Sequence, residues 1–316
     1  MKPDAVQTTG GASATTTPCA TRMPRWLKRG AITLAALIGF AWSGASTYIY
    51  FKQGSIVYLP ARDWIKSPKD AGLAFEDLRL TVKRASGAQE SVNAWWLPAA
   101  GPATGTTAAA NGMNVLFLHG NARNMGAVSN ADKVAALARA GFNVLTLDYR
   151  GYGKSDGSAP YEAAIYEDAS AALDEFKRRA PDAAKRILHG HSMGGAVAID
   201  LATKHPREFI AAFIEATFTS MFDMSTLNPL YRVLPVDTLL TERFESAQKI
   251  GGVKLPVLFI HGTADQRIPH SMSQQLYARA PQPKTLISVS GATHNNLHTF
   301  PEYASAYRLL LEMARK

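Results

Sequence analysis

The stretch Gly190–Gly194, GHSMG, decides how this sequence folds, because it stands between a β-rich run and a helix-forming run. RILH precedes it at residues 186–189, and GAVAIDL follows it at residues 195–201. Glycines two residues either side of a serine let a strand and the next helix approach without Cβ clashes. A lone G-x-S-x-G pattern also fits an ordinary glycine-rich turn, but the flanking strand and helix favour a nucleophile at Ser192.

A serine hydroxyl becomes a good nucleophile only when a base takes its proton. On a strand-to-helix serine turn the partners follow in the order Ser, Asp or Glu, His. Asp265 comes after the apolar run LPVLFIHG at residues 255–262, and His294 comes after KTLISV at residues 284–289. Active-site groups gather at the carboxyl ends of strands in α/β sheets. We therefore predict Asp265 as the acid and His294 as the base.

Two other carboxylates are alternatives for the acid. Glu215 closes the predicted strand at residues 209–214, and Asp148 closes the one at residues 143–147. The order along the chain favours Asp265, whose loop lies one strand before the histidine.

Other histidines are alternatives for the base. His298 lies four residues after His294, where it is expected to be a partly exposed side chain at the start of a helix. His191 and His261 are expected to be packed or hydrogen-bonded, because a neighbour in sequence does not place its imidazole on the serine hydroxyl.

The tetrahedral intermediate of acyl transfer needs hydrogen-bond donors for its oxyanion. One donor in this arrangement is the backbone amide after the nucleophile, here that of Met193. The second comes from the loop after an earlier strand, and the predicted strand 115–118 is followed by His119, Gly120 and Asn121. Asn121 is therefore the second predicted donor, also through its main chain.

These motifs together resemble the α/β-hydrolases, and most of all the N-terminally anchored ones related to depalmitoylases and serine aminopeptidases. The segments that carry the resemblance are FLHGN at 117–121, LDYRGYGKS at 147–155, the Ser192 turn, HGTAD at 261–265 and Ile268-Pro269. They cover the chain from about Asn114 to its C-terminus, and QGSIVYLP at 53–60 resembles the segment after the anchor. The resemblance implies hydrolysis by a Ser-His-Asp triad. Arg123 departs from the pattern, because such proteins often carry a small residue there.

Length and composition agree with one large domain. The 316 residues are 47% hydrophobic, and a single α/β domain commonly reaches roughly 250 residues. The net charge is +9, of which residues 1–52 carry +5. The remainder shows no basic run with interleaved aromatic residues, so nucleic acid is not an expected partner.

Cys19 is the only cysteine, which excludes an intrachain disulfide and any cysteine-cluster metal site. No zinc-type histidine spacing and no phosphate-cradling loop is present. The sequence predicts an enzyme without metal or cofactor.

The N-terminal part predicts a membrane anchor. The first 22 or so residues are rich in Thr, Ala, Gly and Ser and are expected to be disordered. Ala31–Tyr50 is uncharged and apolar, close to the roughly 20 residues that span a bilayer. Four cations lie just before this stretch, namely Arg22, Arg25, Lys28 and Arg29, and only Lys52 lies immediately after it. The excess of positive charge on the N-terminal side predicts a cytoplasmic N-terminus and an extracytoplasmic catalytic domain.

A cleaved signal peptide is the alternative, because Ser43-Gly44-Ala45 resembles a signal-peptidase site. With an uncleaved anchor, the predicted parts are a disordered basic segment at 1–30, a transmembrane signal-anchor helix at 31–51 and a catalytic domain at 52–316.

The predicted fold class is α/β, with a mostly parallel central sheet flanked by helices on both faces. Residues 78–82 and 91–97 read as a leading antiparallel pair, after which strands and helices alternate. The alternation breaks at about 217–250, which predicts a small helical cap over Ser192. Its apolar residues are candidates for binding a small or lipophilic acyl substrate, above all Phe218, Met221 and Phe222. These residues fit equally well a cap that only packs against the core.

The predicted function is cleavage of an ester, thioester or amide by a serine hydrolase of the carboxylesterase or thioesterase type, with a peptidase possible. A catalytically silent, membrane-tethered binding protein on the same fold is the alternative.

Overall fold

The computed structural model describes residues 23–100, 112–157 and 159–315. Cys19, the segment expected to be disordered at 1–22 and most of the loop expected between Ala99 and Gly112 lie outside the described residues. The chain divides into two compact units, Met1–Ala45 and Ser46–Lys316.

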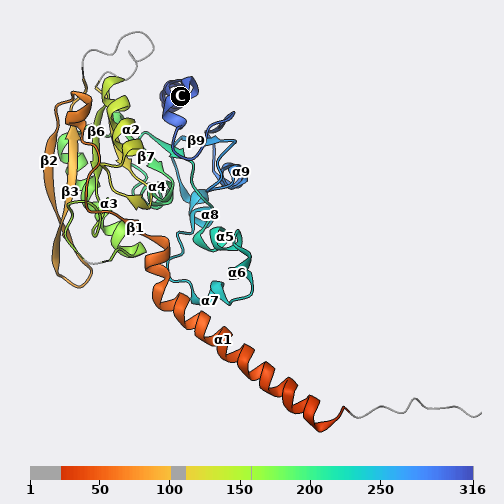
Figure 1. The fold of residues 1–316 in the computed structure, drawn as a ribbon. Helices are drawn as coiled ribbons and strands as arrows, with labels where there is room; N and C mark the ends of the chain where they lie inside the picture. Colours follow the sequence, from red (N-terminus) through yellow and green to blue (C-terminus); the bar gives the residue numbers. More distant parts are fainter. Residues whose placement is uncertain (1–22, 101–111, 158, 316) are drawn as a thin grey trace, which may run out of the picture. The chain divides into compact units, whose positions relative to one another are not determined.

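An eight-stranded sheet forms the centre of the second unit (Figure 1). Its strands, in spatial order, are β10 (Lys284–Val289), β9 (Val257–Gly262), β8 (Ala211–Glu215), β7 (Arg186–His191), β4 (Asn114–Leu118), β6 (Asn143–Leu147), β3 (Gln89–Leu97) and β2 (Glu76–Lys83). The six strands from β10 to β6 run parallel, whereas β3 and β2 are antiparallel to their neighbours. Strands β4, β7, β8 and β9 are buried along their whole length, as is typical of parallel strands covered on both faces.

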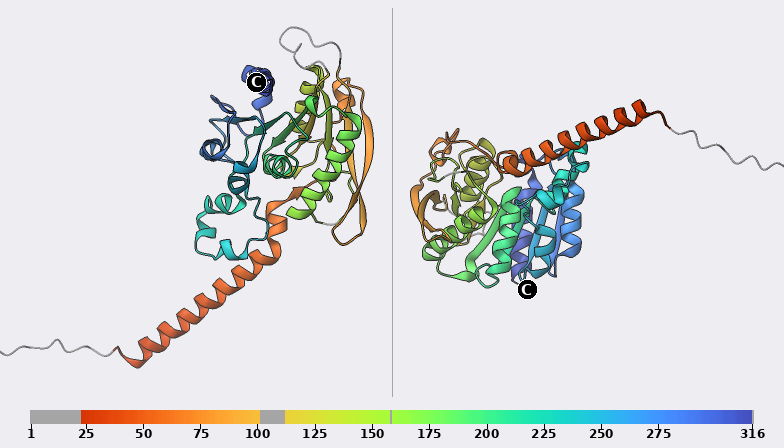
Figure 2. Two further views of the ribbon diagram at one scale, coloured as in Figure 1. Left: turned by 180° about the vertical axis from the view of Figure 1, so that it is seen from behind. Right: turned by 90° about the horizontal axis from the view of Figure 1, so that it is seen from below.

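Helices cover both faces of this sheet (Figure 2). Helices α3 (Glu162–Arg179), α4 (Met193–Lys204) and α9 (His270–Arg279) contribute to one buried apolar cluster. Helices α2 (Val128–Arg139) and α10 (Pro301–Ala314) contribute to a second cluster on the other face. The predicted three-layer α/β class, with its leading antiparallel pair, is confirmed.

Four short helices lie between β8 and β9, in the region predicted as the cap. They are α5 (Met221–Thr226), α6 (Pro229–Arg232), α7 (Val236–Leu239) and α8 (Ser246–Lys249). Single turns of 3-10 helix are found at η1 (Pro68–Ala71), η3 (Ala183–Lys185), η4 (Ile250–Gly252) and η5 (Leu297–Thr299). A two-stranded parallel ladder joins β1 (Leu59–Pro60) to β5 (Ala122–Arg123).

Helix α1 (Arg25–Val57) contains the predicted anchor and is longer than it at both ends. It is long and apolar enough to cross a membrane by length and composition. Its last three turns belong to the second compact unit, where Gln53 and Val57 are buried. The Gln53 side chain donates to the carbonyl of Leu239 (3.3 Å) and accepts from the amide of Thr241 (2.7 Å), so this end of α1 is bonded to the cap region.

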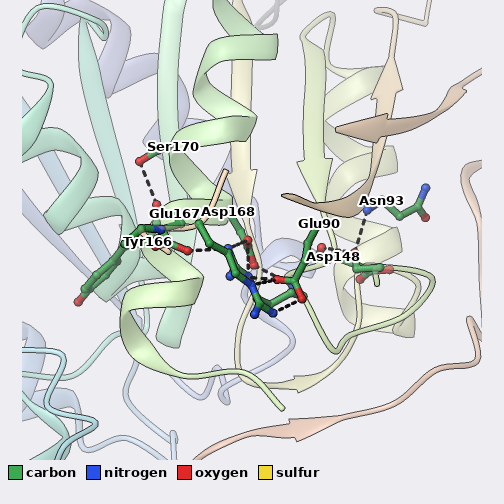
Figure 3. Close-up of polar contacts among 11 residues, drawn as sticks. Glu90, Asn93, Asp148, Tyr166, Glu167, Asp168 and Ser170 are labelled. Carbon is green, nitrogen blue, oxygen red and sulfur yellow. Dashed lines mark hydrogen bonds and ion pairs between the residues drawn. The ribbon is translucent and has the colours of Figure 1, made fainter. Parts of the chain in front are cut away.

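A buried ion cluster fixes the loop after β6 (Figure 3). The fully buried guanidinium of Arg150 contacts Asp168 (2.7 Å), Glu167 (2.9 Å) and Glu90 (3.2 Å). Burying a cation is costly unless carboxylates surround it, so these three acids hold Arg150 in one place. Two residues further along, the hydroxyl of Tyr152 donates to the carbonyl of Asn121 (2.8 Å). The cluster thus supports a loop on which a predicted oxyanion donor lies.

Candidate active site

Ser192 stands at the sharp turn between β7 and α4, as predicted. Its backbone has φ 57° and ψ −124°, a conformation that side-chain-bearing residues rarely adopt. Three hydrogen bonds hold it there: its amide donates to the Glu215 carbonyl (2.9 Å), and its carbonyl accepts from Thr217 Oγ1 (2.7 Å) and the Gly195 amide (2.9 Å).

The two glycines of the motif are required by close backbone contact. A Cβ on Gly190 would lie 2.1 Å from the carbonyl oxygen of Gly194, and one on Gly194 would lie 2.0 Å from that of Leu118. Neither distance is sterically possible, so the strand and helix can meet at Ser192 only because both residues lack a side chain.

Hydrogen bonds link Ser192, His294 and Asp265. His294 Nε2 is 3.0 Å from Ser192 Oγ, and His294 Nδ1 is 2.7 Å from Asp265 Oδ2. Because a carboxylate only accepts, Nδ1 carries the ring proton, which leaves Nε2 free to accept the serine proton. Ser192 and His294 are 6% and 7% exposed, so a substrate can reach them while bulk water is largely excluded.

Four donors hold the Asp265 carboxylate, one of which is His294 Nδ1. Its Oδ1 accepts from the amides of Arg267 (2.8 Å) and Ile268 (3.0 Å), and its Oδ2 is also 3.2 Å from His261 Nε2. Burial acts to raise the pKa of Asp265, but the hydrogen bonds from His261 and His294 outweigh it and hold the pKa below its ordinary range. Asp265 therefore stays ionised opposite His294.

His261 is the functional contact that sequence reasoning missed. It was expected to be a packed or hydrogen-bonded residue, and it is fully buried, but one of its bonds goes to the carboxylate that also binds His294. Its Nδ1 is 2.6 Å from Ser273 Oγ. The signal that could have found it is its position four residues before Asp265, at the end of the same strand.

The alternative acids bind elsewhere. Glu215 is fully buried and contacts Lys133 Nζ (2.7 Å), His189 Nε2 (3.0 Å) and the Tyr303 hydroxyl (3.2 Å). Although burial acts to raise the pKa of Glu215, chiefly Lys133 holds it well below the ordinary value. Its carboxylate is therefore neutralised by its own ion pair.

Asp148 accepts from the Met125 amide (2.6 Å) and from Trp64 Nε1 (3.0 Å), and burial raises its pKa to about 6. Of the alternative bases, His298 lies in the turn η5, and His191 Nε2 donates to the backbone carbonyl of His294 (3.0 Å). Among the residues weighed as acid or base, His294 is the one that bonds to Ser192 Oγ, and Asp265 is the one whose carboxylate bonds to His294.

The loop with the second predicted oxyanion donor lies against the serine. A Cβ on Gly120 would be 3.0 Å from Ser192 Cβ, so only a glycine fits there comfortably. The Asn121 side chain donates to the carbonyl of Val57, the last residue of α1 (2.6 Å), and its own carbonyl accepts from the Leu59 amide (3.1 Å). Asn121 and Ser192 line one pocket, and the Met193 amide follows directly at the N-terminus of α4.

That pocket has a volume of about 140 Å³, and its lining is a mixture of polar and apolar surface. Its wall includes Ser192, His294 and Asn295, together with Arg123 and Arg267. A second hollow of about 240 Å³ is apolar and also touches Asn121. It is lined by residues of the end of α1 and of the cap, among them Ile56, Met221, Met224, Tyr231 and Leu240.

The three apolar cap residues predicted to bind substrate lie in three different surroundings in the structure. Met221 lines the apolar hollow. Phe218 is 3% exposed and packs with its ring 6.3 Å from that of Phe244, and Phe222 lines a different hollow with Asp223 and Arg243. Among the described residues, no group of three or more His, Cys, Asp or Glu side chains is placed to hold a metal ion.

Comparison with known proteins finds relatives that align with most of this chain and with most of their own length. A family model described as serine aminopeptidase, S33, matches residues 110–249. An uncharacterized protein of Mycobacterium tuberculosis is 31% identical over 90% of this chain and 94% of its own length. The protein bem46 of Schizosaccharomyces pombe is 32% identical over 86% of this chain and 83% of its own.

Solved structures share the fold. The Pyrococcus furiosus esterase Pf2001 superposes with a TM-score of 0.62 at 21% identity, over 80% of this chain and 98% of that one. The α/β-hydrolase GrgF of Penicillium gives a TM-score of 0.57 at 17% identity, over 77% and 98%. The chain belongs to the α/β-hydrolase family.

Proposed function

We propose that this protein is a membrane-anchored serine hydrolase that cleaves an ester, thioester or amide of a lipophilic acyl group. The observation that carries the proposal is the continuous chain of hydrogen bonds from Ser192 Oγ through His294 to Asp265. A serine hydroxyl next to an oriented, charge-supported imidazole is the arrangement that acyl transfer requires.

The mechanism follows from these contacts. His294 Nε2 takes the proton of Ser192 as Oγ attacks the carbonyl carbon, and Asp265 stabilises the imidazolium that forms. The amides of Asn121 and Met193 stabilise the oxyanion. His294 then returns the proton to the leaving alcohol, thiol or amine, and the acyl-enzyme forms. Water, activated by the same histidine, releases the acid and restores Ser192.

The apolar hollow supports a lipophilic acyl group. It adjoins the oxyanion loop through Asn121, so a chain on the carbonyl carbon can extend into it. Its apolar walls would remove that chain from water, which contributes roughly 0.8 kcal/mol for each buried CH₂.

The length and composition of α1 support the anchor. Its exposed apolar side chains would be covered by lipid, and they include Ile32, Leu34, Leu37, Ile38 and Phe40. We propose a cytoplasmic N-terminus and a catalytic domain on the other side of the membrane.

Labelling with a fluorophosphonate tests the chemistry, because the reagent reacts with an activated serine. We expect wild type to be labelled and to hydrolyse p-nitrophenyl esters, and Ser192→Ala and His294→Ala to lose most turnover while keeping the wild-type circular dichroism spectrum. Ser170→Ala on α3 is the control, because the Ser170 hydroxyl donates to the Tyr166 carbonyl and Ser170 is not among the described residues that line the pocket or the apolar hollow. Turnover within about threefold of wild type in either site variant would overturn the triad. Folded wild type without labelling or turnover would instead favour a binding protein.

A further inference from the structure

The described lining of the pocket around Ser192 includes two arginines and no acid. Of the described residues that line it, Arg123 and Arg267 are charged and none is Asp or Glu. Both arginines are exposed, and within the part of the chain that the structure describes neither guanidinium has a hydrogen bond or an ion pair. Other arginines of the same unit, such as Arg150, Arg179 and Arg243, bind carboxylates.

The backbone fixes where both arginines start. Arg123 has φ 67°, in the left-handed region that disfavours residues with a side chain. The β1–β5 ladder holds it there, with the Ala61 amide donating to its carbonyl (2.9 Å). The Arg267 amide donates to Asp265 Oδ1 (2.8 Å), so its loop is tied to the carboxylate that supports His294. A strained backbone at a cationic residue that lines the pocket beside Ser192 calls for a role in that pocket.

The chemistry of the site tells which part of a substrate meets these cations. His294 must return its proton to the leaving atom, so the leaving group lies on the His294 side of Ser192. Arg267 and Asn295 line the same pocket as His294, whereas the apolar hollow shares only Asn121 with the described lining of that pocket. The acyl chain and the leaving group therefore face surfaces of opposite character.

We propose that Arg123 and Arg267 form a binding site for an anionic group, a carboxylate or a phosphate, on the leaving-group part of the substrate. The inference rests on the proposed hydrolase function and narrows its substrates to those whose leaving alcohol, thiol or amine carries a carboxylate or phosphate group. Guanidinium groups suit both anions, because their N–H donors match carboxylate and phosphate oxygens.

The test compares esters that share one acyl chain and differ in leaving-group charge. The substrates are 4-butanoyloxybenzoate and 4-butanoyloxyphenyl phosphate as anions, and 4-butanoyloxybenzamide as the neutral reference. The assay uses the full chain in a neutral detergent. We expect the kcat/KM of wild type to be higher for at least one anionic ester than for the neutral ester. Arg123→Gln and Arg267→Gln should each lower the ratio of anionic to neutral kcat/KM about threefold to tenfold.

Three controls sharpen the readout. Arg123→Lys and Arg267→Lys keep the charge and should retain much of the preference. Arg308→Gln, an exposed arginine on α10, should leave the ratio at its wild-type value. Added salt should shrink the preference, because it screens exposed charges. If Arg123→Gln does not fold, Arg267→Gln and the two lysine variants still decide the question.

A binding measurement separates this inference from the proposed function. The Ser192→Ala variant leaves the esters intact, so calorimetry can measure their binding. It should show tighter binding of an anionic ester than of the neutral ester 4-butanoyloxybenzamide, and adding Arg267→Gln to Ser192→Ala should remove the difference. Hydrolysis with the same ratio in wild type and the glutamine variants, and equal binding of all three esters, would overturn the anion site and leave the hydrolase standing. Preferential binding without any hydrolysis would overturn the hydrolase and leave the anion site.

Discussion

At the scale of single residues, the site depends on which carboxylate supports His294. Asp265 bonds to His294 Nδ1 (2.7 Å), whereas Glu215 is bound to Lys133 and His189. We expect Asp265→Asn to lower kcat by about 10²–10⁴, because the imidazole loses its orientation and its charge partner. Glu215→Gln should act mainly on stability, by leaving Lys133 buried without its anion. Ester hydrolysis and melting temperature measure the two effects, and a large loss of kcat in Glu215→Gln alone would move the acid to the earlier strand.

The same carboxylate makes stability depend on acidity. Because Asp265 has a folded pKa below its ordinary value of 3.8, its stabilisation is complete above that value and is lost as the pH falls toward the folded pKa. We expect Asp265→Asn to melt below wild type at about pH 7, and the gap to narrow below about pH 4. Thermal melts across this range measure the gap, with the exposed Asp174→Asn as control. A gap that stays constant on acidification would contradict the assignment.

At the scale of elements, the end of α1 and the loop after β4 form one unit. The Asn121 side chain donates to the Val57 carbonyl, while Tyr152 and Leu59 donate to the Asn121 carbonyl. Asn121→Ala keeps the amide proposed to bind the oxyanion but loses the bond that positions it. We expect kcat to fall about 10-fold to 100-fold, with a loss of stability of about 1 kcal/mol.

Asn143→Ala is the matched control for this loop. The Asn143 side chain donates to Asn114 Oδ1 (2.9 Å), at the opposite end of the parallel strands from Ser192. Its Oδ1 also accepts from the Ala99 amide (2.9 Å), so Asn143→Ala should lose at least as much stability as Asn121→Ala, without the loss in kcat. Equal kcat values in the two variants would show that the bond to α1 does not position the oxyanion loop.

At the scale of the whole molecule, the charges flanking the apolar part of α1 predict on which side of the membrane the proposed enzyme meets its substrate. Four cations lie between residues 22 and 29, close before Ala31, and Lys52 follows Tyr50. We expect protease added outside spheroplasts to digest the catalytic domain, and carbonate washing to leave the protein with the membrane, because a spanning helix is held by hydrocarbon burial. Protection from the protease would contradict the orientation, and release of activity with a new N-terminus near Ser46 would establish a cleaved signal.

Local patterns in the amino-acid sequence are enough to predict the main strands and helices and their order along the chain. Runs of apolar residues specify the buried strands, and glycines two residues either side of Ser192 specify the turn, because both depend only on neighbours along the chain. The α/β class, the placement of Ser192, Asp265 and His294 after β7, β9 and β10, and a helical cap all follow from such local patterns.

The packing of the folded chain sets which side chains from distant segments meet. It separated Asp265, which bonds to His294, from Glu215, which bonds to Lys133, and it turned Met221, but not Phe218 or Phe222, toward the apolar hollow. It also bonded Asn121 to the last residue of α1, 64 positions earlier. Such contacts depend on the packing of elements that are distant along the chain, where a shift of one ångström makes or breaks a hydrogen bond, and no local pattern encodes that distance.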